Sequence, residues 1–257
     1  MLTDAELTRY ARQAILPELG EEGQEKLLAS RALILGAGGL GSPVIALLAA
    51  AGIGQLTICD GDKIELSNLN RQFIHPDSAL GENKAEQAAA FANRLNPAIR
   101  TIAVPQMMTR ASIAGLLAGQ DMVLDCTDQM ASRQLIAQAA RAAGIPHIFG
   151  GAVRMIGQLS VFMAGVPGHA EAACLGCLFP QQPGPDLAPN CAEVGILGPV
   201  VSVIGSLMAA EAVKLAAGLG GSMAGRLLLY DGAAVRFDEI TYSRQSDCPL
   251  CGDSGQP

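Results

Sequence analysis

A glycine-rich turn between an apolar strand and a helix is the feature that most restricts the fold of this chain. Residues 31–35 form a short apolar segment, and the turn Gly36-Ala37-Gly38-Gly39-Leu40-Gly41 follows it directly. In a G-x-G-x-x-G turn the first glycine permits a tight bend, the second lets a phosphate approach the backbone, and the third lets the helix pack against the strand. Free N–H groups at the start of the helix also favour an anion. The motif predicts a nucleotide-binding α/β protein, and an ordinary tight turn without a ligand is the alternative.

Helical and strand patterns alternate over the first 150 residues, and this order predicts a Rossmann-like, mainly parallel sheet with helices on both faces. We expect helices at 4–16, 21–30, 42–51, 83–95, 110–118 and 129–143, and strands at 31–35, 55–60, 99–104, 122–125 and 146–149. The later elements are a strand at 158–163, a loop at 167–189, a helix at 198–217 and antiparallel strands at 226–230 and 235–240. The turn Asp231-Gly232 favours a hairpin between the last two. No linker is evident, so one domain over residues 1–257 is predicted, with N-terminal helices at 1–30 and two halves at 31–150 and 151–257.

Asp60 ends the second predicted strand, and a carboxylate at this place can accept hydrogen bonds from ribose hydroxyls. The glycine turn and Asp60 together fit NAD, FAD or ATP, because each ligand offers a phosphate and a ribose. The motif therefore predicts a nucleotide without identifying it.

Two cations follow at the same edge of the predicted sheet, where open α/β sheets bind their ligands. Arg71 lies in the segment Ser67-Asn68-Leu69-Asn70-Arg71-Gln72, and Lys84 begins the next helix. An NAD enzyme has little use for two more cations there, whereas a triphosphate does, because negative charge grows on its oxygens as pyrophosphate leaves. These cations favour ATP, and solvated surface charge is the alternative.

An acidic segment, Asp125-Cys126-Thr127-Asp128, ends another predicted parallel strand at that edge. A carboxylate so placed can hold a Mg²⁺ ion that bridges phosphates. Asp125 ends the strand itself and is interpreted as structural, so Asp128 is the predicted magnesium ligand. Asp128 could also cap the following helix, and the two roles are compatible.

Two Cys-x-x-Cys pairs, Cys174 with Cys177 and Cys248 with Cys251, lie far apart in the second half. Four thiolates in two such pairs predict a closed tetrahedral zinc site that ties the C-terminal segment to the body of the fold. A redox pair or four unrelated thiols are the alternatives. Cys59 and Cys126 lie on predicted strands and are interpreted as core residues.

The bulk properties exclude several classes of protein. The net charge of −7 argues against binding of nucleic acid or of an anionic membrane. Seven cysteines without a secretory signal indicate a reducing compartment, so a cytoplasmic location is expected. The most apolar stretch, residues 195–210, contains glycines and a proline and is predicted to be a buried helix. His75, His147 and His169 form no triad-like pattern and are interpreted as non-catalytic.

Taken together, these motifs resemble the ThiF/MoeB/HesA family, the bacterial relatives of ubiquitin-activating enzymes. The match runs through the GAGGLG turn, Asp60, SNLNRQ, Lys84, DCTD and the cysteine pairs in order, and an N-terminal Arg9-Tyr10-Ala11-Arg12-Gln13 segment matches too. The resemblance implies a nucleotidyltransferase that adenylates the C-terminal Gly-Gly carboxylate of a ubiquitin-like sulfur carrier and releases pyrophosphate. The carrier is a ThiS type in thiamin synthesis or a MoaD type in molybdopterin synthesis.

The resemblance also implies a role for each matching residue. The glycines of the turn and Asp60 would hold ATP, Asp128 would hold Mg²⁺, and Arg12 would act across a homodimer. The four cysteines would bind structural zinc. The phosphate contacts would come from Asn68, Arg71, Gln72 and Lys84.

Cys191 belongs to neither pair, and the resemblance leaves two roles open for it: a covalent link to the activated carrier, or an inert loop thiol. The segments around Cys191 and Gly198 look more like ThiF, whereas Ala152-Val153-Arg154-Met155 looks more like MoeB, and the ThiF type is favoured. The chain has no room for a rhodanese domain, so sulfur is expected from a separate donor such as a cysteine desulfurase. An NAD-dependent oxidoreductase with structural zinc and an inactive binding protein are the alternatives.

Overall fold

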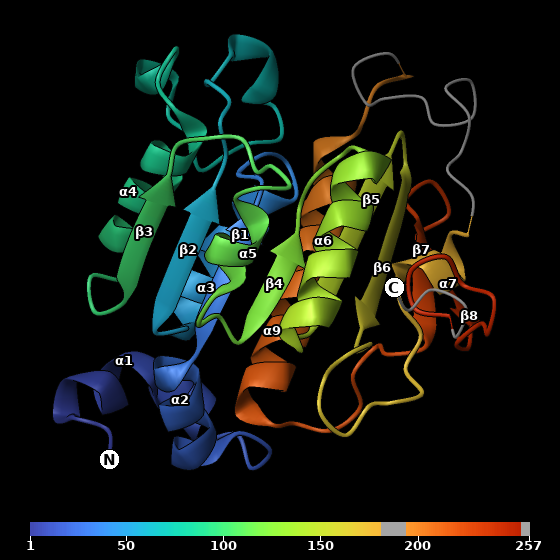
Figure 1. Cartoon of the computed structure of the whole chain (residues 1–257). Coiled ribbons are helices and arrows are strands. Elements are labelled where there is room, and N and C mark those ends of the chain that lie inside the picture. Colours follow the sequence, from blue (N-terminus) through green and yellow to red (C-terminus); the bar gives the residue numbers. More distant parts are fainter. Residues whose placement is uncertain (181–193, 253–257) are drawn as a thin grey trace.

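A computed structural model describes residues 1–180 and 194–252, and eight strands of this part form one continuous sheet (Figure 1). The strand order is β3-β2-β1-β4-β5-β6-β7-β8. The pairs from β3 to β5 are parallel, and the pairs from β5 to β8 are antiparallel. The strands are β1 (Arg31–Leu35), β2 (Gln55–Cys59), β3 (Arg100–Val104), β4 (Met122–Asp125), β5 (His147–Val153), β6 (Ile156–Phe162), β7 (Arg226–Asp231) and β8 (Arg236–Thr241). This arrangement confirms the predicted α/β class.

Helices cover both faces of the sheet (Figure 1). They are α1 (Asp4–Ala14), α2 (Gly20–Ala29), α3 (Gly41–Ala51), α4 (Lys84–Leu95), α5 (Ile113–Leu117), α6 (Met130–Ala143), α7 (Leu175–Leu178) and α9 (Gly198–Ala217), with short 3-10 helices η1 (Leu66–Asn68) and η2 (Asp77–Ala79). Helices α3, α4 and α9 pack on one face, and α5, α6 and α7 pack on the other.

Strand β1 shows how the sequence produces these layers. Successive side chains of a strand point to opposite faces of a sheet. Ala32 and Ile34 accordingly join the core beneath α3 and α9, while Leu33 and Leu35 join the core beneath α5 and α6. All four side chains are buried, so β1 is apolar on both of its faces. A parallel strand that is covered on both faces is expected to be continuously apolar, without alternation of apolar and polar residues.

Helix α9 is long and apolar enough to cross a membrane by length and composition. In this fold it packs against α3, β5 and β6, and it buries Ile204, Met208 and Ala212 completely. Pro199 lies in its first turn, where the missing N–H costs no helical hydrogen bond, and Gly218 ends it in the left-handed conformation. The helix is therefore a core element of the described structure, as the sequence predicted.

The main difference from the sequence prediction is the hairpin of β5 and β6. Strand β5 continues to Val153 rather than ending near 149, and β6 begins at Ile156. Two glycines of this hairpin, Gly150 and Gly157, lie against α9. A Cβ on Gly150 would lie 2.2 Å from Sδ of Met208, and one on Gly157 would lie 2.3 Å from Cγ1 of Ile204, so both glycines allow α9 to approach the sheet.

Smaller differences affect the helices. The predicted loop at 167–189 contains the short helix α7, and the predicted helix at 110–118 narrows to α5. Helix α1 ends at Ala14 with Ile15 as its C-cap, two residues earlier than predicted. Each change lies at an element end or in a single turn, where hydrophobic periodicity carries little information.

Candidate active site

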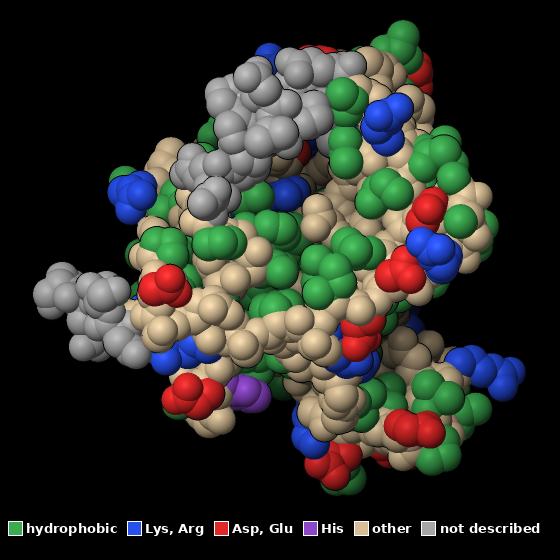
Figure 2. Space-filling view, turned by 90° about the vertical axis from the view of Figure 1, so that its right-hand side faces the viewer, with side chains coloured by type: hydrophobic (Ala, Val, Ile, Leu, Met, Phe, Trp, Pro, Cys, Tyr) green, Lys and Arg blue, Asp and Glu red, His purple; other side chains and the backbone are tan. Residues whose placement is uncertain are grey.

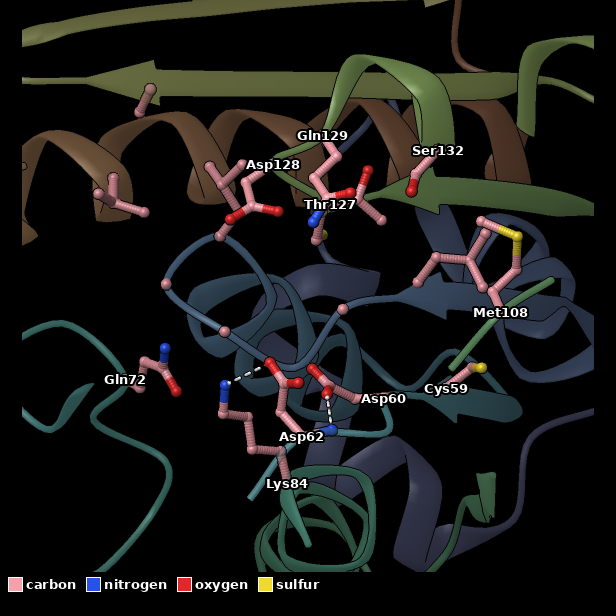
Figure 3. A pocket seen from close by; sticks show the side chains of 18 of the residues that line it. Cys59, Asp60, Asp62, Gln72, Lys84, Met108, Thr127, Asp128, Gln129 and Ser132 are labelled. Carbon is pink, nitrogen blue, oxygen red and sulfur yellow. Dashed lines mark hydrogen bonds and ion pairs between the residues drawn. The ribbon is translucent and has the colours of Figure 1, made fainter. Parts of the chain in front are cut away.

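A pocket lies at the edge of the sheet where β1, β2 and β4 end (Figure 3). The motifs predicted to bind nucleotide meet there because these strands are parallel and end at the same edge. The predicted residues that line the pocket are Gly36, Gly38, Gly39, Asp60, Arg71, Gln72, Lys84 and Asp128.

The glycine turn is held in shape by close backbone contacts. Gly36 has φ of 100°, which is unfavourable for other residues, and a Cβ on it would lie 2.8 Å from the carbonyl oxygen of Cys126. Gly41 begins α3, and a Cβ there would lie 2.1 Å from the carbonyl oxygen of Gly36. Gly41 therefore shapes the turn without lining the pocket, whereas Gly38 and Gly39 face it.

Two side chains, the partly buried Asp60 and the buried His75, hold the backbone of Ala37 within this turn. The N–H of Ala37 donates to Oδ2 of Asp60 at 2.7 Å, and its carbonyl lies 2.9 Å from Nε2 of His75. Burial lowers the pKa of His75, which favours the neutral ring and a donated Nε2–H. His75 is thus a structural support of the turn.

Asp60 has two hydrogen bonds within the protein and still faces the pocket (Figure 3). Its Oδ1 accepts from the N–H of Asp62 at 2.8 Å, and its Oδ2 accepts from Ala37. Burial raises the pKa of Asp60, although these two bonds oppose the rise. A carboxylate has about four acceptor positions, so two remain for a ribose.

The two predicted cations approach the pocket from separate segments. Lys84 is only 8% exposed, and its Nζ pairs with Oδ2 of Asp62 at 3.0 Å (Figure 3). Arg71 donates from Nη1 to the carbonyl of Ser67 and to Oδ1 of Asn70, both at 2.9 Å. Both side chains are oriented by the protein before any ligand arrives, which reduces the entropy lost on phosphate binding.

Asn68 and Gln72 differ in their position relative to the pocket. Asn68 is the last residue of η1, its Oδ1 accepts from the N–H of the N-cap residue Glu65, and it does not line the pocket. Gln72 lines the pocket and is 5% exposed, and its Oε1 has no hydrogen-bond partner in the described structure.

Asp125 fixes the turn that carries Asp128. Its Oδ1 accepts from the N–H and the hydroxyl of Thr127 at 3.1 and 2.7 Å, and its Oδ2 lies 3.2 Å from Nε2 of His147. Arg133 donates to the carbonyl of Thr127 from Nη2 at 2.8 Å. Burial acts to raise the pKa of Asp125, but the bond from His147 and the charge of Arg133 outweigh it, so the pKa is lowered.

His147 has one hydrogen-bond partner in the described structure. Its Nε2 lies 3.2 Å from Oδ2 of Asp125, and its Nδ1 is buried without a partner. Asp128 itself is exposed and lines the pocket. Gln129 is the N-cap of α6, and Asp128 makes no cap hydrogen bond, so the alternative role for Asp128 is not observed.

Removal of the Thr127 hydroxyl tests this turn. Thr127→Val is expected to lower the free energy of unfolding by about 1–2 kcal/mol, because a buried carboxylate loses one of its donors. Thr127→Ser, which keeps the hydroxyl, is the control and is expected to cost much less. Urea unfolding of the three proteins measures both, and equal losses for Val and Ser would show that the hydroxyl bond is unimportant.

Arg12 lies far from the pocket of its own chain. Its helix α1 packs at the opposite end of the sheet (Figure 1). Tyr10 bonds to Asn96, and Gln13 bonds to Gln24 and to the carbonyl of Ala51, so the neighbours of Arg12 fix the helix. Arg12 is exposed, and no partner for it is found in the ranges 1–180 and 194–252. Cys191 lies outside the described residues.

The four predicted zinc ligands converge (Figure 1 shows the segments that carry them). Their sulfur atoms all lie within 4.8 Å of one another, and all four side chains are packed in one small buried cluster. The sulfurs of Cys174 and Cys248 are 3.5 Å apart, and those of Cys177 and Cys251 are 3.4 Å apart. Sulfurs at the corners of a tetrahedron around zinc are about 3.8 Å apart, given Zn–S bonds of about 2.3 Å, so this cluster fits the metal.

Several lining residues were missed by sequence reasoning. Asp62 lies two residues after Asp60 and pairs with Lys84, and Arg133 lies in α6 and bonds to the carbonyl of Thr127. Met107 and Met108 follow β3 and give the pocket an apolar side next to Cys59 (Figure 3 labels Met108 and Cys59). The sequence offered one signal for these two residues, because the methionine pair follows a strand that ends at the pocket edge.

An open α/β sheet with a glycine turn, two oriented cations and an acidic turn at one pocket is typical of enzymes that bind the phosphates of a nucleotide. The ThiF family model matches residues 10–250, and the chain belongs to the ThiF family. This membership places the chain among the nucleotidyltransferases and confirms the family resemblance.

Two similar proteins match the chain over nearly its whole length. A sulfur carrier protein adenylyltransferase of Thermus thermophilus is 42% identical over 98% of this chain and 93% of the relative. A molybdopterin-synthase adenylyltransferase of Escherichia coli is 41% identical over 98% of each chain. The structure of E. coli MccB with ATP has a TM-score of 0.81 at 22% identity, covering 95% of this chain and 75% of that one, and shares the fold.

Proposed function

We propose that this protein activates the C-terminal Gly-Gly carboxylate of a ubiquitin-like sulfur carrier by adenylation with ATP. The observation that carries the proposal is the gathering of Arg71, Lys84 and Asp128 around the glycine turn in one pocket. The name of the Thermus thermophilus relative, a sulfur carrier protein adenylyltransferase, supports a sulfur carrier as the substrate. We also propose a cytoplasmic enzyme of one domain, with residues 151–257 as its carrier-binding half.

The reaction needs no strong base. A carboxylate is already ionised at neutral pH, and one of its oxygens attacks the α-phosphorus of ATP. The bond from that phosphorus to the bridging oxygen breaks, and pyrophosphate leaves with the electron pair. Asp60 orients the ribose, while Arg71 and Lys84 offset the charge that grows on the leaving group. A magnesium ion, for which Asp128 is the proposed ligand, would supply further charge neutralisation.

Phosphate binding by Lys84 requires this side chain to exchange its ion-pair partner. Its Nζ is paired with Asp62, so a phosphate has to compete with that carboxylate for the cation. Asp62 is 57% exposed in its side chain, whereas Lys84 is buried. The carboxylate can therefore move into solvent while the lysine stays in place.

The pocket gives no support to hydride transfer. No Tyr or His, the side chains that often exchange a proton with an alcohol or ketone, is among the described residues that line it. The two cations and Asp128 have no task in such a reaction. The oxidoreductase alternative is therefore the weaker proposal.

Pyrophosphate exchange with ATP tests the proposed reaction. Wild-type protein is assayed with a ThiS-type and, separately, a MoaD-type carrier, each with an intact Gly-Gly end. We favour the ThiS type, although relatives with both kinds of name are similar to this chain. Exchange with the ThiS-type carrier alone would support a role in thiamin synthesis. Exchange with the MoaD-type carrier alone would assign the protein to molybdopterin synthesis. Exchange with neither carrier, together with tight NAD binding, would overturn adenylation.

We further propose a homodimer in which Arg12 enters the pocket of the partner subunit. The exposed position of Arg12 at the far end of its own sheet supports this arrangement. Arg12→Ala and Lys84→Ala are each expected to lose most pyrophosphate exchange. A mixture of the two is expected to recover up to about a quarter of wild-type activity, because half of the subunits form mixed dimers and each mixed dimer has one intact site. A mixture as inactive as its components would contradict a shared site.

Two proposals concern the later steps. Cys191 is proposed to react with the activated carrier, with an inert thiol as the alternative, and Cys191→Ala is the variant that separates them. Sulfur is proposed to come from a separate donor such as a cysteine desulfurase.

A separate proposal concerns the cysteine cluster, which is proposed to bind structural zinc.

A further inference from the structure

A second cavity lies at the edge of the sheet opposite the active-site pocket. Strand β6 runs antiparallel to β5 and ends at Phe162, which pairs with His147 at the start of β5, so the segment after β6 lies away from the pocket (Figure 1). The cavity has a volume of about 520 Å³, which is within the usual range for small-molecule sites. We call it the loop cavity, and it lies between the end of α6, residues 164–172 and the C-terminal segment that carries Arg244 and Cys251.

Backbone contacts set the shape of the loop cavity. Three N–H groups after β6 each donate to the carbonyl three residues earlier at 3.0 Å, namely those of Val166, His169 and Ala172. Gly165 has φ of 88°, and a Cβ on it would lie 2.2 Å from the carbonyl oxygen of Arg141, so this position requires glycine. The close approach fixes the end of α6 against the turns that form the cavity wall.

Two arginines from distant segments line the loop cavity. Arg141 lies in the last turn of α6, and Arg244 follows β8. Arg244 donates from Nη2 to the carbonyl of Cys251 at 3.0 Å, which orients its guanidinium group beside the cysteine cluster. A guanidinium group has five N–H donors, so this bond is compatible with further bonds from the same group to an anion.

The positive charge at the loop cavity is weakly compensated. Nη1 of Arg244 lies 3.9 Å from Oε2 of Glu171, and the side chains are 24% and 89% exposed, respectively. An ion pair with so exposed a carboxylate contributes little. Arg141 has no ion-pair partner in the part of the chain that the structure describes. Two like charges at one cavity repel each other, and an anion between them replaces this repulsion by attraction.

This positive charge is local and does not belong to a broad basic face. On the side of the molecule that carries the last strands, Lys and Arg side chains lie among Asp and Glu side chains around a hydrophobic centre (Figure 2). The chain as a whole has a net charge of −7, which repels anions. Anion binding at the loop cavity would therefore have to come from the two arginines themselves.

We propose that the loop cavity binds a phosphate dianion, either free phosphate or the phosphate group of a small ester, between Arg141 and Arg244. Two guanidinium groups offset two negative charges, and their planar forks match the oxygen atoms of a phosphate. The small side chains of Ala170 and Ala172 also line the cavity and leave room for an organic part. A bound phosphate joins α6 to the C-terminal segment, at the edge of the sheet opposite the nucleotide pocket.

Calorimetric titration with sodium phosphate at constant ionic strength tests the proposal. Phosphate can also enter the nucleotide pocket, so Lys84→Ala is the background in which the loop cavity is measured. This protein is expected to bind phosphate with a Kd in the millimolar range or below. Addition of Arg141→Ala is expected to weaken phosphate binding at least about tenfold, because charge-assisted hydrogen bonds are lost.

Arg94→Ala is the matched control in the same background. Arg94 is also an exposed arginine in the last turn of a helix, α4, and it lies outside the loop cavity. Its removal changes the net charge by the same amount as Arg141→Ala and is expected to leave phosphate affinity unchanged.

Thermal unfolding gives a second readout. Phosphate at ten times its Kd is expected to raise Tm of the Lys84→Ala protein by about 3–6 °C. The same phosphate concentration is expected to leave Tm of the protein with the added Arg141→Ala change unaltered. Because Arg141 is exposed, the two proteins are expected to have similar Tm values without phosphate, which separates loss of binding from loss of folding.

Titration with glycerol phosphate distinguishes the two sources of the anion. Tighter binding than that of inorganic phosphate would identify a phosphate ester, and equal or weaker binding would identify free phosphate. Both results retain the site if they depend on Arg141. Unchanged affinity after Arg141→Ala, or equal weakening by Arg94→Ala, would overturn the proposal. So would phosphate binding that arises only when residues 253–257 are deleted, which would assign the cavity to the chain's own C-terminal residues.

Discussion

Asp128→Asn is expected to lower kcat for carrier-dependent pyrophosphate exchange by about 100- to 1,000-fold, the range found when one preorganised electrostatic group is removed from an active site. Asp128 is exposed at the pocket and makes no cap bond to α6, so its carboxylate is available to a metal ion. Asn has nearly the same shape but lacks the charge that a magnesium ligand supplies. The fold is expected to be unaffected.

The assay for Asp128 is exchange over a range of Mg²⁺ concentrations. The variant is expected to need more Mg²⁺ for half-maximal rate as well as being slower. Asp77→Asn, an exposed carboxylate on η2 outside the pocket, is the matched control and is expected to behave as wild type. Near-normal rates and Mg²⁺ dependence for Asp128→Asn would exclude Asp128 as the metal ligand.

Cys248→Ser is expected to abolish zinc binding and to lower Tm strongly. Structural zinc in small cysteine-rich sites contributes apparent free energies of about 10–16 kcal/mol. In a chain of this size even 4 kcal/mol lost from folding would lower Tm by about 8–16 °C. The four sulfurs lie in one buried cluster. The change would therefore leave three buried thiols without the metal ion that they are proposed to share.

Zinc content by elemental analysis and Tm by calorimetry test the cysteine cluster. Wild type is expected to hold one zinc ion per chain, and a strong chelator is expected to reproduce the Tm of Cys248→Ser. Cys59→Ala is the matched control, because Cys59 is a buried thiol outside the cluster, and its zinc content is expected to remain at one. A metal-free wild type that has the same Tm as Cys248→Ser would contradict the zinc proposal.

The nucleotide pocket was predictable because its motifs follow strand ends. A glycine turn after β1, Asp60 after β2 and Asp128 after β4 each lie within three residues of a strand that hydrophobic patterning locates well. Parallel strands then bring these ends to one edge without any knowledge of side-chain contacts. The cysteine pairs were predictable for a similar reason, since two-residue spacing is local and only their meeting is tertiary.

The supports of the pocket were not predictable from the sequence. His147 bonds to Asp125 only because β4 and β5 pair in a particular register, and Arg133 reaches back from α6 to Thr127. Asp62 meets Lys84 through a loop whose path no motif describes. Such contacts depend on distances between segments, whereas periodicity reports only which side of an element is buried.

Strand β5 belongs to both halves of the molecule, since it pairs with β4 on one side and with β6 on the other. The boundary between the parallel part of the sheet, which carries the pocket, and the antiparallel part is therefore a row of backbone hydrogen bonds rather than a hinge. Two rigid bodies cannot close around the substrates across such a boundary. Under the proposed function, the carrier that binds at the sheet edge would be what shields the reacting atoms from water.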